Sequence, residues 1–308
     1  MSQIQQVKEA SDIVEIIGSR LSLQRSGSYM RGLCPFHSEK SPSFFVDENL
    51  QRYKCFGCGE SGDVITFLEK YDGMTFVEAL EDLAKRAGIV LQKFTKSSDD
   101  IRREMILEVL SMAKQYYHFL LTDHEVGAVA REYLKNRLVT KESIKIFQIG
   151  YSLPTWDGLI NYLHKKKKYD LQLLFDAGLI IKSKNGRYYD RFRSRIIFPL
   201  NDHRGRTVGF SGRILAGNEK DAKYINSPET ALYHKSKMLF GFSELYQQIR
   251  TSKQVVVVEG EFDVISSVQA HMNSIVAIKG SALTIDHARL LKRTVEKVLL
   301  SLDTDEAG

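Results

Sequence analysis

The 308-residue sequence predicts a small α+β domain with an antiparallel sheet, followed by a mixed α/β part that ends in a parallel sheet. Two observations predict this order. Near the N-terminus, short strand-like segments surround two turns that carry all 3 cysteines of the chain. Near the C-terminus, three apolar, largely β-branched runs alternate with helical patterns, which is typical of a parallel β-α-β-α-β sheet.

The N-terminal domain is expected to span residues 1–94 and to combine short strands with short helices. Strand propensity between turn residues predicts strands at 21–25, 43–46 and 51–56, with a hairpin turn (DEN) between the last two. Capping residues followed by apolar stripes predict helices at 13–18, 63–70 and 75–88. The two cysteine-bearing turns therefore lie beside a small antiparallel sheet.

The cysteines and one histidine form two knuckles, CPFH and CFGC, which contain Cys34, His37, Cys55 and Cys58. Two knuckles with two ligands each fit a tetrahedral zinc ion, so we interpret this domain as zinc-ribbon-like. Because four protein ligands leave no position for a substrate water, the zinc is expected to be structural. A disulfide would leave one cysteine over and ignore His37, and an iron–sulfur cluster with one histidine is a rarer alternative, as is a chance pattern.

A polar, aperiodic stretch (KFTKSSDD) follows, and residues 95–100 are expected to form a linker. Helical spacing then predicts helices at 101–121, 128–138 and 141–147. Alternating apolar residues predict strands at 196–200 and 207–210. The lysine run at 165–168 is interpreted as a solvated loop or a helix end. Residues 101–250 are thus expected to form the basic, mixed α/β beginning of the second part.

Residues 251–308 predict a parallel sheet that is buried on both faces. Apolar runs predict its strands at 254–258, 275–278 and 298–302. Helical patterns at 262–271 and 284–294 separate these strands and provide the crossover connections. In such a sheet, functional side chains lie just beyond the carboxyl ends of the strands.

Acidic residues follow two of these predicted strands. Glu259 comes directly after the first strand, and Asp303 and Asp305 come directly after the third. Three carboxylates at one sheet edge would repel one another unless a divalent cation were present, and such hard oxygen ligands suit Mg²⁺ or Mn²⁺. Gly260 permits close backbone approach there, and Asp263 could brace the site from the next helix. The alternative is that these residues only cap helices and turns.

The net charge of +6 is unevenly distributed, since residues 131–250 are strongly basic and both flanking parts carry a slight excess of acidic residues. A basic middle beside a carboxylate cluster suits a phosphate-rich partner, although a lysine-rich solvated surface would give the same composition. No apolar run approaches about 18 residues, so no membrane span is expected. The N-terminus lacks a signal-peptide layout, and reduced cysteines also favour an intracellular protein.

Several long motifs resemble one protein family. GLCPFHSEKSPSF and YKCFGCGESGD resemble the zinc-binding domain of bacterial replicative DNA primases of the DnaG type. RFRSRIIFPLNDHRGRTVGFSGR (191–213), KYINSPET (223–230) and the following YHK resemble the basic motifs of that family's RNA polymerase domain. The positions of the acidic residues after the first and third strands resemble those in the Toprim fold, which primases, topoisomerases and some nucleases share. The similarity runs in the family's order from about residue 2 to residue 308.

The resemblance implies roles for single residues. Glu259, Asp303 and Asp305 match the acidic residues that hold Mg²⁺ or Mn²⁺, and Asp263 matches the aspartate that follows the first of them and is counted with the catalytic residues. Five side chains match positions near template, primer or incoming nucleotide: Arg137, Arg213, Lys223, Asn226 and Lys235. Their types fit this role, because arginine and lysine contact phosphates and asparagine provides a directional hydrogen bond. An ordinary surface charge is the alternative for each.

The implied activity is a DNA-templated RNA polymerase that synthesises short RNA primers on single-stranded DNA from ribonucleoside triphosphates, with one structural zinc and catalytic Mg²⁺ or Mn²⁺. The resemblance further implies a bacterial, cytoplasmic protein of the replication fork. Because the chain stops at Gly308, we expect an incomplete Toprim sheet and a missing C-terminal region that binds the replicative DNA helicase. The alternatives are a catalytically incomplete fragment that binds zinc and single-stranded DNA, the N-terminal half of a phage-type primase–helicase, and a Toprim nuclease or topoisomerase.

Two departures from the family pattern lie beside the acidic residues. Glu261 stands where the family usually has an aromatic residue, and it is expected to add a negative charge near the metals. DTDEAG stands where many members have DGDxAG, but both aspartates are kept. In the zinc-ribbon-like domain, arginines and lysines interleave with aromatic residues, so it is expected to read the template start site. Several of these aromatic residues are instead needed for the core of so small a domain.

Overall fold

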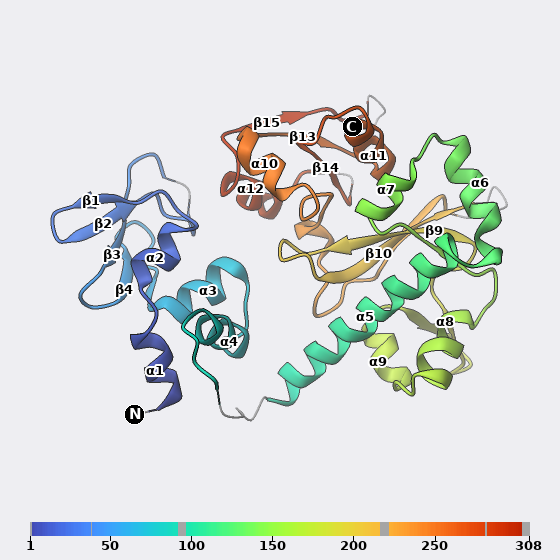
Figure 1. The fold of residues 1–308 in the computed structure, drawn as a ribbon, viewed down its shortest axis with the longest axis horizontal. Coiled ribbons are helices and arrows are strands. Elements are labelled where there is room, and N and C mark those ends of the chain that lie inside the picture. The colour runs from blue at the N-terminus through green and yellow to red at the C-terminus, as the bar shows by residue number, and fades with distance from the viewer. Residues whose placement is uncertain (1, 38, 92–96, 216–221, 281, 304–308) are drawn as a thin grey trace. The chain divides into compact units, whose positions relative to one another are not determined.

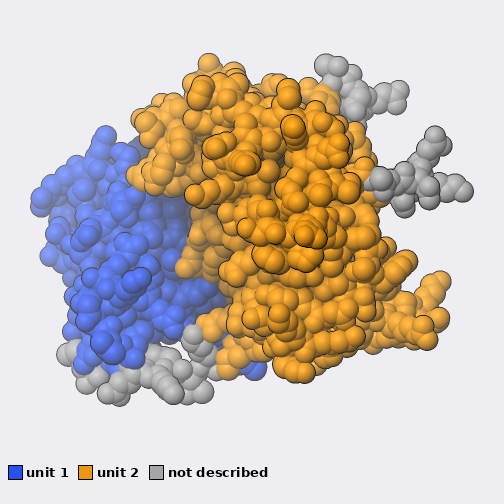
Figure 2. Space-filling model, turned by 45° about the vertical axis from the view of Figure 1, so that its right-hand side comes forward, with its two compact units in different colours: residues 1–100 blue, residues 101–308 orange. Residues whose placement is uncertain are grey.

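The computed structural model describes residues 2–37, 39–91, 97–215, 222–280 and 282–303 (Figure 1). The chain divides into two compact units, residues 1–100 and residues 101–308, which are drawn in blue and orange in Figure 2. Each unit has its own buried core. None of the helices in the described segments has the length and apolarity needed to cross a bilayer.

Unit 1 is built on an antiparallel sheet of five strands in the order β1-β2-β3-β4-β5. The strands are β1 (Gln24–Ser26), β2 (Tyr29–Gly32), β3 (Phe44–Asp47), β4 (Arg52–Cys55) and β5 (Ser61–Gly62). Phe44, Val46 and Tyr53 are buried and pack with Phe67 of a helix in one core. The antiparallel zinc-ribbon-like sheet is therefore confirmed, although the strand predicted at 21–25 begins three residues later and β2 and β5 were not predicted.

Four helices accompany this sheet: α1 (Gln3–Glu9), α2 (Ile13–Gly18), α3 (Val64–Asp72) and α4 (Phe76–Arg86). Three of them begin at the predicted capping residues. Asp12 accepts hydrogen bonds from the first turn of α2, Asp63 accepts one from Thr66 at the start of α3, and Thr75 forms a capping box with Glu78 in α4. These caps fix the helix starts, so the sequence pattern located them to within a residue.

Unit 2 begins with a long helix, α5 (Ser98–Thr122), so residues 98–100 of the expected linker are helical. An antiparallel sheet in the order β11-β10-β9-β6 forms the middle of this unit. Its strands are β6 (Gly150–Ser152), β9 (Arg195–Asn201), β10 (Thr207–Ile214) and β11 (Tyr224–Asn226). β9 and β10 are almost fully buried, which explains why their apolar runs were recognised as strands.

Shorter elements surround this sheet: η1 (Glu125–Gly127), α6 (Ala128–Asn136), α7 (Lys141–Ile146), α8 (Gly158–Ile160), η2 (Asn161–Lys166), α9 (Leu171–Asp176) and the hairpin β7 (Ile180–Lys182) with β8 (Tyr188–Asp190). The predicted helices at 128–138 and 141–147 are α6 and α7. The lysine run at 165–168 covers the last turn and the C-terminal cap of η2, which confirms its interpretation as a helix end.

The second sheet of unit 2 has the order β12-β14-β13-β15. β13 (Gln254–Val258) pairs in parallel with β14 (Ile275–Ile278) and β15 (Lys297–Leu300), and β12 (Leu239–Phe240) is antiparallel to β14. The helices of this region are η3 (Lys235–Lys237), α10 (Tyr246–Ser252), α11 (Glu261–Gln269) and α12 (Ile285–Lys292). The predicted parallel β-α-β-α-β arrangement is confirmed, and α11 and α12 are its crossover helices.

The prediction that all three parallel strands are buried is wrong for β15. The side chains of Val298, Leu299 and Leu300 are 41%, 40% and 58% exposed. The physical reason is its position at the sheet edge, because within the described residues β15 pairs with β13 alone. An apolar run predicts a strand, but it does not state how many neighbours that strand will have.

Candidate zinc centre and candidate active site

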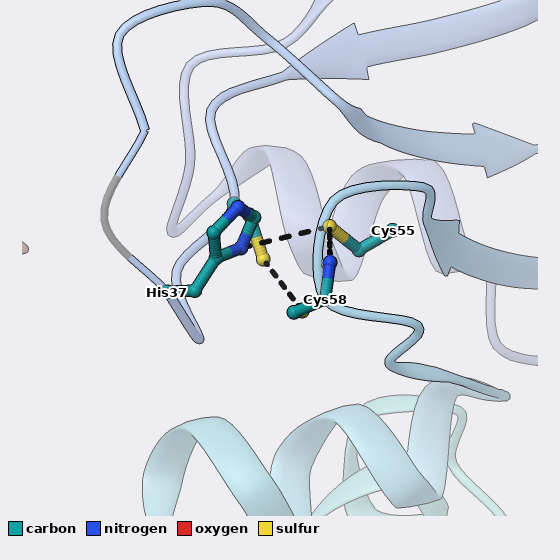
Figure 3. Close-up of side chains that lie close together, drawn as sticks. His37, Cys55 and Cys58 are labelled. Carbon is teal, nitrogen blue, oxygen red and sulfur yellow. Dashed lines mark hydrogen bonds between the residues drawn. The ribbon is translucent and has the colours of Figure 1, made fainter.

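Cys34, His37, Cys55 and Cys58 converge at one point in unit 1, and their ligand atoms all lie within 4.8 Å of one another. Figure 3 shows His37 facing Cys55 and Cys58 across this point. The Sγ atoms of Cys34 and Cys58 are 3.8 Å apart, and Cys55 Sγ is 3.7 Å from His37 Nδ1. Sulfur ligands about 2.3 Å from a tetrahedral zinc would be about 3.8 Å apart, so the donor set fits this ion.

Glu39 supports the cluster from outside. Its carboxylate accepts hydrogen bonds from the backbone N–H groups of Cys34 (2.7 Å) and Ser43 (3.0 Å), and it lies 3.3 Å from His37 Nε2. Burial raises the pKa of Glu39, but the Ser43 hydroxyl and these N–H groups outweigh it and hold the pKa below its ordinary value. A carboxylate on the second ring nitrogen fixes the histidine so that Nδ1 faces the metal. The sequence reading missed this residue.

Backbone shape also serves the zinc centre. A side chain at Gly57 would lie 2.6 Å from His37 Nε2, so this knuckle requires glycine. Burial raises the pKa of the Cys34 thiol to about 12, whereas the Ser43 hydroxyl and backbone N–H groups hold the pKa of Cys55 below its ordinary value despite its burial. A metal must therefore displace a proton from Cys34 when it binds.

A second site is an open cavity of about 490 Å³ in unit 2, between the two sheets. Strand ends and loops bring together there eight residues singled out from the sequence: Arg137, Arg213, Lys223, Asn226, Lys235, Glu259, Asp263 and Asp303. They come from positions up to 166 residues apart along the chain, from Arg137 to Asp303. The ninth, Asp305, lies outside the described residues.

The carboxylates lie at the carboxyl edge of the parallel sheet. Glu259 follows β13, and its Oε1 accepts a hydrogen bond from the backbone N–H of Asp303, which follows β15 (3.1 Å). Asp263 caps α11, because its Oδ2 accepts from Gly260 N–H (3.1 Å) and would lie 2.7 Å from a Cβ at Gly260. Asp263 therefore caps α11 and also lines the cavity.

Within the described part of the chain, none of the three carboxylates forms an ion pair with a lysine or arginine. Among the same residues, the cysteine–histidine cluster is the one group of three or more possible metal ligands with close spacing, so Glu259 and Asp303 have no third described ligand beside them. Glu259 and Asp303 thus form an uncompensated pair of hard donors on one cavity. Such a pair fits a divalent cation, with room for further oxygen ligands.

Two arginines line the same cavity, in a part that we call the arginine wall, and both are held by aromatic rings. Arg213 Nε donates to the Tyr133 hydroxyl (2.5 Å) and its Nη1 donates to the Tyr224 hydroxyl (2.8 Å). The guanidinium groups of Arg137 and Arg213 lie 5.0 and 5.2 Å from the centre of the Phe262 ring. No described carboxylate pairs with either arginine, so both keep their full charge toward the cavity.

Asn226 adds a neutral polar group to this wall. Its Oδ1 is buried and, among the described residues, has no hydrogen-bond partner. The backbone carbonyl of Asn226 accepts two hydrogen bonds from Arg191, which fixes the position of the strand end. Because Asn226 also lines the cavity, its side-chain amide can offer a directional hydrogen bond to a ligand.

Glu261 does not add an unpaired charge to the metals as the sequence suggested. It is 2% exposed and forms a buried ion pair with Lys279 at the end of β14. Burial raises the pKa of Glu261, but the Lys279 ammonium and the Ser211 hydroxyl outweigh it and leave the pKa below its ordinary value. No local pattern predicts this pairing, because 18 positions separate the partners.

The aromatic residues of unit 1 divide between its core and its surface. Phe44 and Tyr53 are 0% and 1% exposed and belong to the core, whereas Phe56 is 68% exposed. Phe45 faces Phe56 edge-on at 5.3 Å. Arg31 lies over the Phe45 ring and Lys54 over the Phe56 ring, at 5.3 and 5.2 Å. We call these four residues (Arg31, Phe45, Lys54 and Phe56) the ribbon face.

A second exposed cation–aromatic cluster was missed in the sequence. Trp156, the single tryptophan, is 63% exposed, and the Arg193 guanidinium lies 4.1 Å from the centre of its ring. Tyr189 packs edge-on against the tryptophan at 5.4 Å. A solvent-exposed tryptophan in a polar stretch is a weak sequence signal, because its arginine partner lies 37 positions away.

Family comparisons agree with the two units. A family model described as "CHC2 zinc finger" matches residues 1–99, and the zinc cluster lies inside it. A model described as "DNA primase catalytic core, N-terminal domain" matches residues 116–246. A "Toprim-like" model matches residues 256–308, which contain Glu259 and Asp303. These matches support a zinc site in unit 1 and a divalent-metal site in unit 2.

Curated proteins named "DNA primase" match nearly the whole chain. The protein from Halalkalibacterium halodurans is 41% identical over 308 residues, covering 99% of this chain and 51% of the relative. The protein from Geobacillus stearothermophilus is 40% identical over 311 residues, covering 99% of this chain and 51% of the relative. The chain thus spans about half the length of the curated relatives it matches.

Solved structures extend the likeness to the fold. The zinc-binding and RNA polymerase domains of the Aquifex aeolicus primase superpose with a TM-score of 0.61 at 33% identity, covering 100% of this chain and 74% of that one. A DnaG primase catalytic domain described as bound to single-stranded DNA has a TM-score of 0.61 at 37% identity, covering 68% of this chain and 64% of that one. With its zinc cluster, polymerase-type middle and Toprim-like sheet in the same order, the chain belongs to the DnaG-type family of DNA primases.

Proposed function

We propose that this chain synthesises short RNA primers on a single-stranded DNA template from ribonucleoside triphosphates, as part of DNA replication. The observation that carries the proposal is the cavity of unit 2, which brings Glu259 and Asp303 together with Arg137, Arg213 and other basic residues. Carboxylates that bind metal and cations that bind phosphate are the two parts that nucleotidyl transfer requires.

Glu259 and Asp303 would hold the divalent cation, and the proposal assigns Asp305 to the same ligand set. The cation is Mg²⁺ or Mn²⁺, and when bound it lowers the pKa of the attacking 3′-hydroxyl and stabilises negative charge on the transferred phosphate. Asp303 N–H positions Glu259 by binding its Oε1, so both ligands move with the sheet edge. Asp263 supports the same edge by capping α11.

The basic residues that line the cavity would bind the triphosphate and the template. Arg137 and Arg213 carry fixed, unneutralised charges, and Lys223 and Lys235 add two exposed lysines. Arginine and lysine in this arrangement contact phosphates, and their affinity falls with salt. Asn226, which lines the cavity, would contribute a directional hydrogen bond from its side-chain amide to a sugar hydroxyl or a base edge.

Single-stranded template would contact two exposed cation–aromatic surfaces. Trp156, Tyr189 and Arg193 in unit 2 combine rings for base stacking with a charge for the backbone. The ribbon face of unit 1 has the same chemistry and would read the start site. A related catalytic domain described as bound to single-stranded DNA supports a template of this kind. The same proposal includes a zinc-binding domain at residues 1–94, a linker at 95–100, and an RNA polymerase domain whose basic part spans 101–250 and whose Toprim part spans 251–308. It also includes a bacterial, cytoplasmic location and a replicative DNA helicase as partner.

Primer synthesis from labelled ribonucleotides on single-stranded DNA tests the function. Wild-type chain with Mg²⁺ should yield short RNA, and Glu259→Gln should lower the rate by at least about a hundredfold because one metal ligand is lost. Glu296→Gln changes an exposed glutamate that pairs with Lys253, and it should leave the rate unchanged.

Binding of the same DNA, measured by fluorescence anisotropy, separates the alternatives. If the wild type binds DNA but makes no primer, the chain is a binding fragment and the proposal fails. Primers made equally well by Glu259→Gln would also contradict it, since they would place the chemistry elsewhere.

A further inference from the structure

Glu261 and Lys279 form an ion pair that is almost fully removed from solvent, with side-chain exposures of 3% and 4%. Glu261 is the first residue of α11, and Lys279 follows β14. Ser211 of β10 lies against the Glu261 carboxylate, and the Lys279 ammonium lies over the Phe240 ring at 5.6 Å. The pair therefore joins the start of α11 to the end of β14, with β10 of the other sheet beside it.

Stability alone does not explain this pair. Taking two charges out of water costs about as much as their attraction returns, so well-packed apolar residues would serve a core at least as well. The location is informative instead, because Glu261 and Lys279 line the same cavity as Glu259 and Asp303. Glu261 is also separated from Glu259 by Gly260 alone.

We propose that Glu261 and Lys279 balance each other's charge beside the cation site, so that neither buried charge alters the cation affinity of the cavity. The pair locks the loop after β13 to the loop after β14, and each charge cancels the other. The electrostatic field on a cation held by Glu259 and Asp303 then comes from these two ligands, and the buried charges of Glu261 and Lys279 add nothing to it. This inference rests on the proposed function, which identifies the ligand as a divalent cation.

Opposite charges predict opposite effects when one partner is neutralised. Glu261→Gln leaves a buried ammonium beside the cation site and should weaken Mn²⁺ binding by about three- to tenfold. Lys279→Met leaves a buried carboxylate and should bind Mn²⁺ as tightly as the wild type or more tightly. Glu261→Gln combined with Lys279→Met removes both charges and should return the affinity to the wild-type value. A pair with a purely structural role would weaken binding in both single variants.

Electron paramagnetic resonance of free Mn²⁺, titrated into the zinc-loaded 308-residue chain without DNA or nucleotide, measures this affinity independently of primer synthesis. Lys253→Met and Glu296→Gln are the matched controls. Their ion pair is 65% and 73% exposed at the other end of β13, so neither change should alter Mn²⁺ binding. If Lys279→Met does not fold, Glu261→Gln and the double variant still decide, because the double variant contains no unpaired buried charge.

Three results would overturn the inference: an unchanged affinity in Glu261→Gln, a weakened affinity in Lys279→Met, or a double variant that stays weakened. Its failure is distinct from failure of the proposed function. If Glu259→Gln abolishes Mn²⁺ binding while the variants of the pair leave it unchanged, the cation site stands and the role of the pair is wrong. A wild-type chain that binds no Mn²⁺ contradicts both.

Discussion

Arg213 shows how one side chain is prepared for its ligand. Its guanidinium is oriented by two phenol hydroxyls, those of Tyr133 and Tyr224, and by the ring of Phe262. A lysine would keep the charge but could not donate both hydrogen bonds in this fork geometry. The orientation of the charge, and not only its presence, is therefore a property of this residue.

Arg213→Lys is expected to raise KM for ribonucleotides by roughly tenfold, and Arg213→Ala by more, because the alanine variant also loses the charge. Steady-state primer synthesis measures both, and Arg289→Lys on the exposed surface of α12 is the control. Equal KM values for wild type and Arg213→Lys would indicate that charge alone matters at this position.

Single residues were predictable where chemistry restricts the residue type. The sequence pattern singled out the four candidate zinc ligands, which the fold brings together, because few residue types bind metals and their spacing is regular. It also singled out Glu259 and Asp303, which line one cavity. Glu39 and Lys279 gave no such signal. Their roles come from partners that the fold brings close, and glutamate and lysine are otherwise ordinary surface residues.

Asp190 connects two elements of unit 2. It ends β8, and its carboxylate accepts hydrogen bonds from the backbone N–H groups of Leu159 (2.7 Å) and Ile160 (3.1 Å) at the start of α8. Burial raises the pKa of Asp190 to about 7, and these two hydrogen bonds only partly oppose it. The folded chain thus binds a proton here that the unfolded chain releases above about pH 4.

Because the pKa is raised in the folded state, the stability that comes from protonated Asp190 is full below about pH 4 and is lost as the pH rises toward 7. Relative to Asp190→Asn, wild-type unit 2 should lose on the order of 3 kcal/mol of unfolding free energy over this range. Urea unfolding followed by Trp156 fluorescence reports on it locally, since the Trp156 carbonyl accepts a hydrogen bond from Asp190 N–H. A difference between the two proteins that does not vary with pH would contradict the assignment.

Elements were predictable where caps and apolar periodicity agree. α2, α3 and α4 begin at capping residues, and β13 and β14 are continuous apolar runs, so their local sequence determines them. The hairpin β7–β8 and the short strands β6 and β11 were not predicted. Each has three residues, which is too short to show an alternating pattern, and β6 in addition pairs with β9, which is distant in sequence.

At the scale of the whole molecule, the two units depend on different sources of stability. Cys34 and Cys55 are part of the core of unit 1, so the metal site and the hydrophobic core of this small domain are one structure. Unit 2 has two hydrophobic cores of its own and contains none of the cysteines. Metal binding to a small domain contributes directly to its folding.

Removal of zinc with a chelator is therefore expected to unfold unit 1 and leave unit 2 folded. Amide hydrogen exchange followed by mass spectrometry on the full chain should show fast exchange in β3 and β4 and unchanged protection in β9 and β10. Cys58→Ser should reproduce this result without chelator. Loss of protection in both units would mean that they unfold as one cooperative structure.

Because rings rather than carboxylates support Arg137 and Arg213, an arriving anion displaces no internal counter-ion from this wall. Under the proposed function, the wall would offer the same two guanidinium groups to a triphosphate that enters and to the inorganic pyrophosphate that leaves. Product release would then compete with substrate entry for the same two guanidinium groups, and accumulated pyrophosphate would slow the next turnover even while nucleotides remain plentiful.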